Sequence, residues 1–296
     1  MPELPEVAGL CAFLDAKLRG AVLTKVQITS FAVLKTADPP YSALEDRTVA
    51  GVQRFGKFLG LDMGGVHFIF HLAKAGWLRY TENPSPAPLR LGSSPIAARL
   101  AFTAPPSAAS DGGPAKMAFD LTEAGSRKSL AVYVVREPQD VPGIASLGPD
   151  PLAPDFTREA FDGILAASQQ IKGLLRSQSV VAGIGNAYSD EILHAARISP
   201  FAIARTLDGA SRDRLFAAIG SVLGEAVGSA VGKAPDELKD GKRSAMRVHG
   251  RAGEQCPVCG DVVREVSFAD TALQYCPGCQ TNGKILADRR TSRFLK

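Results

Sequence analysis

Four of the five cysteines form two Cys-x-x-Cys pairs near the C-terminal end of the chain, Cys256-Pro-Val-Cys259 and Cys276-Pro-Gly-Cys279. The residues between the pairs alternate in polarity as a strand does. Two such pairs can place four thiolates around one tetrahedral metal ion and leave no ligand position for water. Because so short a segment cannot build its own core, the metal would hold it together. We therefore predict a zinc ribbon over 246–296 with one structural zinc ion, against the alternative of four free thiols.

Length and composition limit the class of protein. A chain of 296 residues is too long for a typical single core and suggests two or three domains. The 34 lysines and arginines exceed the 30 acidic residues slightly, which permits a polyanionic partner without requiring one. No apolar run approaches the roughly 20 residues that span a bilayer, and the first residues lack a signal-peptide pattern. We expect a cytoplasmic protein with no membrane partner, and cysteines kept reduced.

The first 137 residues have the pattern of an antiparallel β-sandwich with one N-terminal helix. Apolar residues at helical spacing over 7–18 predict the helix. The stretch 103–116 is too polar and too rich in proline and glycine to order itself, so we expect a loop there. Short apolar or alternating runs separated by turn residues predict strands at 22–28, 48–54, 58–63, 67–71, 77–80, 98–102 and 130–135.

A proline-rich linker at 138–155 precedes a helical region, 156–245. Gly183-Ile-Gly185-Asn186 lies just before one of its helices. Two glycines two apart leave backbone N–H groups uncovered at a helix N-terminus, which suits a phosphate oxygen. A tight turn between helices that needs glycine for steric reasons explains the same residues. The helices are predicted at 158–169, 171–177, 187–196 and 211–231.

The chain opens with Met-Pro-Glu-Leu-Pro-Glu-Val. Removal of the initiator methionine would leave Pro2 with a free secondary amine beside the carboxylate of Glu3. An α-amino group has a pKa near ~8, against ~10.4 for lysine, so more of it is nucleophilic at neutral pH. With a sugar aldehyde carbon a secondary amine gives a permanently charged iminium, and Glu3 could move the protons. The alternative is that the prolines only stiffen the terminus.

Taken together, these features resemble the formamidopyrimidine-DNA glycosylase and endonuclease VIII family, and the opening is nearer the first branch. The resemblance also rests on Arg54-Phe-Gly-Lys57-Phe-Leu, on the stretch 171–193 around Gly183-Ile-Gly185, and on the ribbon ending in Cys279-Gln280. It runs in the same order over nearly the whole chain. It implies an α+β multidomain fold: a β-sandwich (1–137), a helix-two-turns-helix DNA-binding domain and a C-terminal zinc ribbon.

The resemblance implies a monomeric base-excision-repair enzyme that acts on damaged duplex or abasic-site DNA of the nucleoid, flipping the damaged nucleotide out of the helix. Pro2 would be the Schiff-base nucleophile of a bifunctional glycosylase and lyase that ends in β-elimination. Glu3 would be the proton donor, with Glu6 behind it. Lys57 would bind the phosphate beside the lesion.

For DNA contacts, the resemblance implies that Lys172 and Asn186 bind phosphates. Three positions depart from the family. Lys74 stands where a methionine wedge is usual, Arg127 is left without the phenylalanine that accompanies it, and Thr271 replaces the arginine credited with a second elimination. The basic tail, with Arg289 and Arg290, is either a further phosphate contact or a solvated end.

Three function classes fit these residues. The first is a working glycosylase and abasic-site lyase with altered lesion recognition. The second is a damaged-DNA or abasic-site binding protein that keeps the fold but removes few bases. The third, a zinc-ribbon transcription factor, explains the C-terminus but leaves the N-terminal amine and carboxylate without a role.

Overall fold

A computed structural model describes residues 1–85, 87, 89, 95–104, 115–124, 128–268 and 271–287. The chain forms two compact units, each made of two segments. The N-terminal unit comprises Met1–Ser146 and Ala230–Lys239, and the C-terminal unit comprises Leu147–Ser229 and Asp240–Lys296. Within the residues just named, no helix has both the length and the apolar character that crossing a membrane requires.

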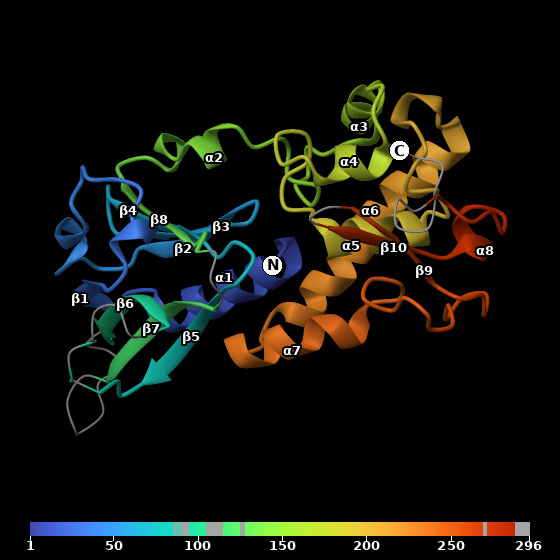
Figure 1. The fold of residues 1–296 in the computed structure, drawn as a ribbon. Helices are drawn as coiled ribbons and strands as arrows, with labels where there is room; N and C mark the ends of the chain where they lie inside the picture. Colours follow the sequence, from blue (N-terminus) through green and yellow to red (C-terminus); the bar gives the residue numbers. More distant parts are fainter. Residues whose placement is uncertain are drawn as a thin grey trace. The chain divides into compact units, whose positions relative to one another are not determined.

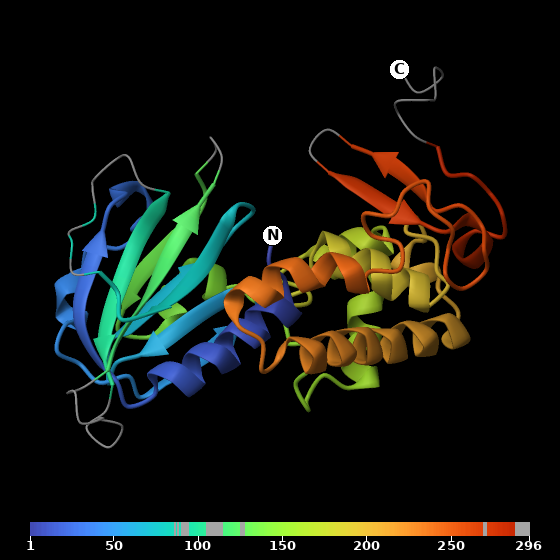
Figure 2. The same cartoon turned by 90° about the horizontal axis from the view of Figure 1, so that it is seen from below.

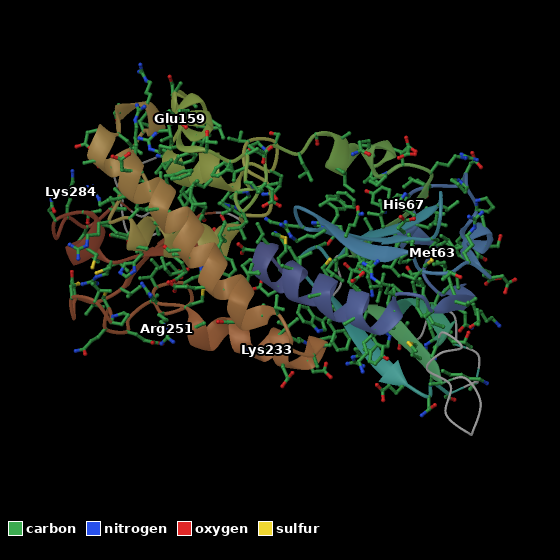
Figure 3. All side chains as sticks on the ribbon, turned by 180° about the vertical axis from the view of Figure 1, so that it is seen from behind. Met63, His67, Glu159, Lys233, Arg251 and Lys284 are labelled. Carbon is green, nitrogen blue, oxygen red and sulfur yellow. The ribbon has the colours of Figure 1, made fainter. Side chains whose placement is uncertain are left out.

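Two four-stranded antiparallel sheets form the layers of the N-terminal unit (Figure 1). Their strand orders are β1-β6-β7-β5 and β2-β3-β4-β8. The first sheet contains β1 (Val22–Ile28), β5 (Gly76–Glu82), β6 (Ile96–Thr103) and β7 (Lys116–Glu123). The second contains β2 (Gly51–Phe55), β3 (Phe58–Asp62), β4 (His67–His71) and β8 (Ala131–Val135). The turn that joins β3 to β4 carries Met63, labelled with His67 in Figure 3.

Aromatic side chains fill the space between the sheets. The ring of Phe119 on β7 lies 6.3 Å from that of Phe68 and 6.0 Å from that of Phe70, both on β4. All three are at most 1% exposed. Contacts of this kind from both inner faces make a sandwich, as the sequence predicts.

Helix α1 (Leu4–Leu18) closes the sandwich at one edge, and its apolar side chains join the same core. The chain returns to this unit where α6 (Gly209–Ala230) ends and α7 (Pro235–Ala245) begins (Figure 2). At this crossing a Cβ on Gly9 would lie 2.9 Å from the Ala230 carbonyl oxygen, so only glycine fits.

Strand β7 is missing from the sequence prediction. All its residues except Lys116 are buried, so it lacks the alternation of a half-exposed strand. It also carries Asp120, whose carboxylate accepts two hydrogen bonds from Arg99 on β6, at 2.6 and 2.8 Å. The charged Asp120 interrupts the apolar run of this strand, so the sequence pattern alone does not indicate a buried strand.

Helices dominate the C-terminal unit, and the ribbon packs on them through α5, which contacts β10 and α8. The ribbon's buried side chains Val266, Leu273 and Tyr275 pack with Phe201. The two regions predicted as separate domains, 156–245 and 246–296, thus lie largely within one compact unit. Its remaining elements are α3 (Arg158–Leu165), α4 (Ile171–Arg176), α5 (Asn186–Ala195), β9 (Arg264–Ser267), β10 (Ala272–Tyr275) and α8 (Pro277–Gln280), and the short α2 (Pro142–Ala145) precedes the unit.

Candidate functional site

The predicted nucleophile and acid lie at the start of α1. The helix begins at Leu4, three residues before the predicted start, because Glu3 acts as its N-cap. The Glu3 N–H donates to Glu6 Oε2 at 2.8 Å, and the Glu3 side chain accepts from the Glu6 backbone. Glu3 and Glu6 are 3% and 4% exposed, and Pro2 is buried. The Glu3 carboxylate next to Pro2 is therefore held in place at the start of the helix.

Lys57 is placed by the tight turn between β2 and β3. Phe55 and Phe58 pair across this turn, which leaves Gly56 and Lys57 as its two central residues. Gly56 has φ of +54°, a conformation that glycine adopts without strain. Lys57 is 7% exposed. Lys57 directly precedes the predicted strand 58–63, and the turn holds its ammonium in a nearly buried place.

His71, at the end of β4, stays neutral beside Lys57. Burial, with a smaller effect from the Lys57 charge, lowers the pKa of His71 to about 4. Its Nδ1 accepts a hydrogen bond from the Ala73 backbone N–H at 3.2 Å, which requires an unprotonated nitrogen. The ring of Phe58 lies 4.7 Å from the imidazole. His71 thereby fixes the start of the turn that carries Lys74.

That turn presents Lys74 outward. Ala73 has φ of +52°, and Lys74 next to it is exposed. Gly76 closes the turn with its N–H on the Leu72 carbonyl oxygen at 2.9 Å, and a Cβ on Gly76 would lie only 2.2 Å from that oxygen. The position at which the resemblance leads us to expect a methionine is thus the tip of a tight turn with a cation on it.

In the C-terminal unit, Gln178 shapes the glycine turn before α5. Its amide nitrogen donates to the Arg176 and Ile184 carbonyl oxygens at 2.8 and 2.7 Å. Its amide oxygen accepts from the Gly183 N–H at 3.0 Å, where φ is +88°. The turn needs glycine at position 183 for its backbone conformation. This agrees with the explanation that a tight turn between helices requires glycine here.

Lys172 lies inside the C-terminal unit, 5% exposed. Its Nζ is 2.6 Å from Asp190 Oδ1 and 2.8 Å from Ser189 Oγ. It also donates to the Asn186 carbonyl oxygen at 3.2 Å. The second oxygen of Asp190 is 2.8 Å from His249 Nδ1. The ammonium therefore has a carboxylate partner within the protein, a partner that the sequence alone does not indicate.

Neighbouring residues of α5 hold the ribbon. Glu191 accepts the backbone N–H groups of Arg247, Val248 and His249 at 2.8 to 2.9 Å. The Asn186 amide donates to the Ala272 carbonyl oxygen at 2.8 Å. Asn186 was predicted to contact phosphate, and the structure uses its amide nitrogen to join α5 to β10.

The four predicted metal ligands come together in the ribbon. Cys256 Sγ is 3.8 Å from Cys279 Sγ, and Cys259 Sγ is 3.3 Å from Cys276 Sγ. Thiolates bound to one tetrahedral zinc at about 2.3 Å would lie about 3.8 Å apart, so the donor set fits a metal ion. Burial raises the pKa of Cys276 to about 11, and metal binding would therefore release its proton. Arg251 and Lys284, labelled in Figure 3, lie on the loops before and after the cysteines.

A histidine that sequence reasoning missed lies beside these thiols. His194 Nε2 on α5 is 3.3 Å from Cys256 Sγ. Burial, followed by the charges of Arg247 and Arg197, lowers the pKa of His194 to about 4, so the ring is neutral at pH 7. Its spacing from Asp190, one helical turn earlier, is the only hint that the sequence offers.

Three predicted DNA-contacting residues, Arg127, Arg289 and Arg290, lie outside the described residues. Thr271 is described, and its carbonyl oxygen accepts from the Phe268 N–H at 2.7 Å just before β10. The positioning residues that sequence reasoning missed are Gln178, Asp190, Glu191 and His194. Gln178, Asp190 and Glu191 lie within the stretch 171–193 that carries the resemblance, but the sequence does not indicate which groups they bond.

Two family models match the sequence. One, the formamidopyrimidine-DNA glycosylase N-terminal domain, matches residues 1–109. The other, the formamidopyrimidine-DNA glycosylase H2TH domain, matches residues 147–234. Together they cover parts of both compact units.

Several curated relatives are similar over long stretches. An uncharacterized formamidopyrimidine-DNA glycosylase-like protein of Mycobacterium tuberculosis is 56% identical over 152 residues, 51% of this chain and 95% of its own. The formamidopyrimidine-DNA glycosylase of Symbiobacterium thermophilum is 34% identical over 98% of this chain and 93% of its own.

Solved structures share the fold. The MutM (Fpg) protein of Thermus thermophilus is 30% identical, with a TM-score of 0.75 over 94% of this chain and 98% of that one. The Lactococcus lactis formamidopyrimidine-DNA glycosylase, solved non-covalently bound to DNA containing an abasic site, is 24% identical, with a TM-score of 0.77 over 94% and 99%. At that identity the second likeness concerns the fold alone.

Proposed function

Because the chain belongs to the formamidopyrimidine-DNA glycosylase family, we propose that it is a bifunctional DNA glycosylase and abasic-site lyase of base excision repair. It removes oxidised bases through a Schiff base on Pro2 and then carries out β-elimination. The observation that carries this proposal is the buried start of α1, where Glu3 and Glu6 form a capping box next to the buried Pro2. The protein acts as a monomer on damaged DNA of the nucleoid.

The proposed chemistry needs Met1 removed. The Pro2 nitrogen attacks the anomeric carbon of the flipped nucleotide, the glycosidic bond electrons leave with the base, and the base takes up the proton that the Pro2 nitrogen loses. Glu3 protonates the ring oxygen as the sugar opens, and the nitrogen becomes an iminium. Loss of a proton from the adjacent sugar carbon then expels the 3′ phosphate. Glu6 holds the Glu3 backbone during these steps.

Lys57 supplies the cation for the phosphate beside the lesion. Its place in the β2–β3 turn is rigid, and burial leaves it little water to give up when a phosphate binds. His71 remains neutral nearby and therefore does not repel the lysine at neutral pH. A fixed, oriented cation of this kind stabilises the charge that develops on the leaving phosphate.

For the DNA partner we propose Lys74, Arg127, Arg289 and Arg290 as direct contacts. The L. lactis complex with abasic-site DNA supports DNA as the ligand of this fold. We propose Lys172 and Asn186 as phosphate contacts as well, and their polar groups also bond Asp190 and the Ala272 carbonyl oxygen inside the C-terminal unit. They keep the glycine turn before α5 in the shape that meets the DNA backbone.

For the metal we propose one structural zinc ion, held by Cys256, Cys259, Cys276 and Cys279. Four thiolates are one of the usual ligand sets of structural zinc, and two sulfur pairs at 3.8 and 3.3 Å bring the thiols close enough to share one ion. When bound, the ion supplies no chemistry at the lesion and stabilises the ribbon that α5 holds. Metal analysis of freshly purified protein should give one zinc per chain.

The test of the enzymatic proposal is borohydride trapping on abasic-site DNA. Reduction should convert the Pro2 iminium into a stable protein–DNA adduct, and Pro2→Gly should reduce its yield strongly. Lys57→Ala should slow strand cleavage by about 10²-fold or more, the usual effect of losing one charge-stabilising group. Lys25→Ala removes an exposed lysine of the same unit and serves as the matched control.

A second function, binding of damaged DNA without base removal, has one observation in its favour. Lys74 at the rigid turn tip cannot fill the gap of a flipped base as an apolar side chain does. The trapping experiment decides between the two functions. No adduct from the wild-type protein, together with tight abasic-site binding, would refute the lyase.

A further inference from the structure

The ribbon has a fifth donor beside its four thiols. The Nε2 of His194 and the sulfurs of Cys256, Cys276 and Cys279 all lie within 4.8 Å of one another. A zinc–nitrogen bond of about 2.0 Å and a zinc–sulfur bond of about 2.3 Å at the tetrahedral angle place the two ligand atoms about 3.5 Å apart. The separation of 3.3 Å between His194 Nε2 and Cys256 Sγ is close to this value.

His194 belongs to a face of α5 that holds the ribbon. Asn186, Asp190 and His194 recur every four residues and therefore lie on one side of the helix. Asn186 bonds the Ala272 carbonyl oxygen, and Asp190 accepts from the Gln274 N–H at 3.2 Å. The imidazole is therefore positioned by a helix that is anchored to the ribbon at two further points, and its place does not depend on a metal.

The two ring nitrogens of His194 differ. Nε2 faces the sulfurs, whereas Nδ1 is buried and has no hydrogen-bond partner among the described residues. Since none of those residues selects a tautomer from the Nδ1 side, Nε2 can carry a proton and donate to a thiolate, or present its lone pair to a metal.

Cys259 is the most replaceable of the four thiols. Cys256 and Cys276 are buried and Cys279 is partly buried, whereas Cys259 is exposed. The group within 4.8 Å that includes His194 is formed without Cys259. An exposed thiolate is also the ligand most open to chemical loss, by alkylation for example.

We propose that His194 is a reserve ligand of the metal site. With Cys259 in place, four thiolates bind the ion and His194 Nε2–H donates to the sulfur of Cys256. When the Cys259 thiolate is lost, the ring presents the Nε2 lone pair and completes a site of three sulfurs and one nitrogen. The proposal rests on the proposed zinc site and adds a fifth donor to it.

The test is zinc content and zinc retention of full-length variants. Cys259→Ser should purify with about one zinc per chain, and so should His194→Phe. The double variant Cys259→Ser/His194→Phe should carry well under one. Against a chelator, His194→Phe should speed zinc loss by about tenfold or more in the Cys259→Ser background, a typical effect of a lost metal-site residue. In the wild-type background it should have a much smaller effect.

Cobalt substitution reports the donor atoms directly. Absorption from sulfur-to-cobalt charge transfer grows with the number of thiolates, so Cys259→Ser should show a three-thiolate spectrum that retains tetrahedral bands. If His194→Phe disturbs packing, His194→Gln is the second variant, because glutamine fills the space but ligates zinc poorly. Cys276→Ser is the matched cysteine control, since it removes a sulfur that both ligand sets share and should lose zinc whether or not His194 is present.

Two outcomes overturn the inference. One is a Cys259→Ser protein as poor in zinc as the double variant, and the other is a double variant that keeps its zinc. Both are distinct from failure of the zinc proposal itself, in which the wild-type protein would already carry well under one equivalent.

Discussion

The proposed chemical groups of the N-terminal unit are positioned by contacts between residues close in sequence, whereas charged groups of the C-terminal unit are held by distant ones. Glu3 and Glu6 are three residues apart in their capping box. Lys172 and Asp190 are 18 apart. Glu191 reaches Val248 across 57 residues.

This difference distinguishes residues that could take part in a reaction from residues that stabilise the fold. A helix start or a tight turn positions an amine or a carboxylate through local backbone geometry, so the reacting group can be changed while its support stays in place. A buried charge with distant partners holds elements together, and removing one member leaves the other without compensation. By this criterion Pro2, Glu3 and Lys57 suit the proposed reaction, and Lys172 also supports the fold of its unit.

The largest expected effect is a loss of stability when the buried Lys172–Asp190 ion pair of the C-terminal unit is disrupted. Asp190→Asn would leave the Lys172 ammonium buried without its countercharge, at a cost of about 3–5 kcal/mol in unfolding free energy. Urea unfolding followed by a probe in the C-terminal unit measures it. Adding Lys172→Met removes the uncompensated charge and should recover much of the loss.

The control for this prediction is an exposed pair of the other unit. Asp38 and Arg136 lie 3.0 Å apart in solvent, so Asp38→Asn should cost less than about 1 kcal/mol. A loss for Asp190→Asn as small as this one would show that Lys172 has other adequate partners, and the comparison between the two units would no longer hold.

The next effect is a pH dependence in the N-terminal unit. Because the pKa of His71 falls to about 4 in the folded protein, from about 6.5 in the unfolded chain, the unfolded state binds more protons between these values. The stability from neutral His71 is therefore fully present above pH 6.5 and is lost as pH falls toward 4, by about 2 kcal/mol at pH 5. His71→Asn should flatten the stability profile of this unit between pH 7 and 5. Identical acid sensitivity of variant and wild type would contradict the neutral, partly buried imidazole.

The smallest effect concerns the exposed turn tip. Extruding a paired nucleotide costs a few kcal/mol, and an apolar wedge offsets part of that cost. Lys74→Met should therefore raise single-turnover activity on duplex oxidised purines by roughly threefold to tenfold, about 1 kcal/mol, and change activity on abasic sites less. An equal change on both substrates, or a wild-type enzyme already fast on paired oxidised purines, would count against the wedge argument.

Local patterns predicted most elements within a few residues. Strands 22–28 and 67–71 have the predicted bounds, because each has apolar residues at a clear period and turn residues beside it. Helix α7 was missed for the opposite reason. Its sequence is strongly polar, and its start depends on Glu237, whose side chain accepts from the Ala234 N–H at 2.8 Å. A helix defined by capping instead of by an apolar face gives no periodic signal.

The sequence by itself determined the groups whose geometry is local. The Pro2–Glu3 pair, the cysteine pairs and the glycine at each tight turn follow from spacings of one to three residues, over which backbone stereochemistry is decisive. Only the tertiary structure decided that Lys172 pairs with Asp190 and that His71 stays neutral beside Lys57. It also decided that His194 contacts Cys256, 62 positions further along the chain. Packing brings these pairs together, and burial then sets their charges, because the cost of a desolvated charge depends on neighbours that no local pattern specifies.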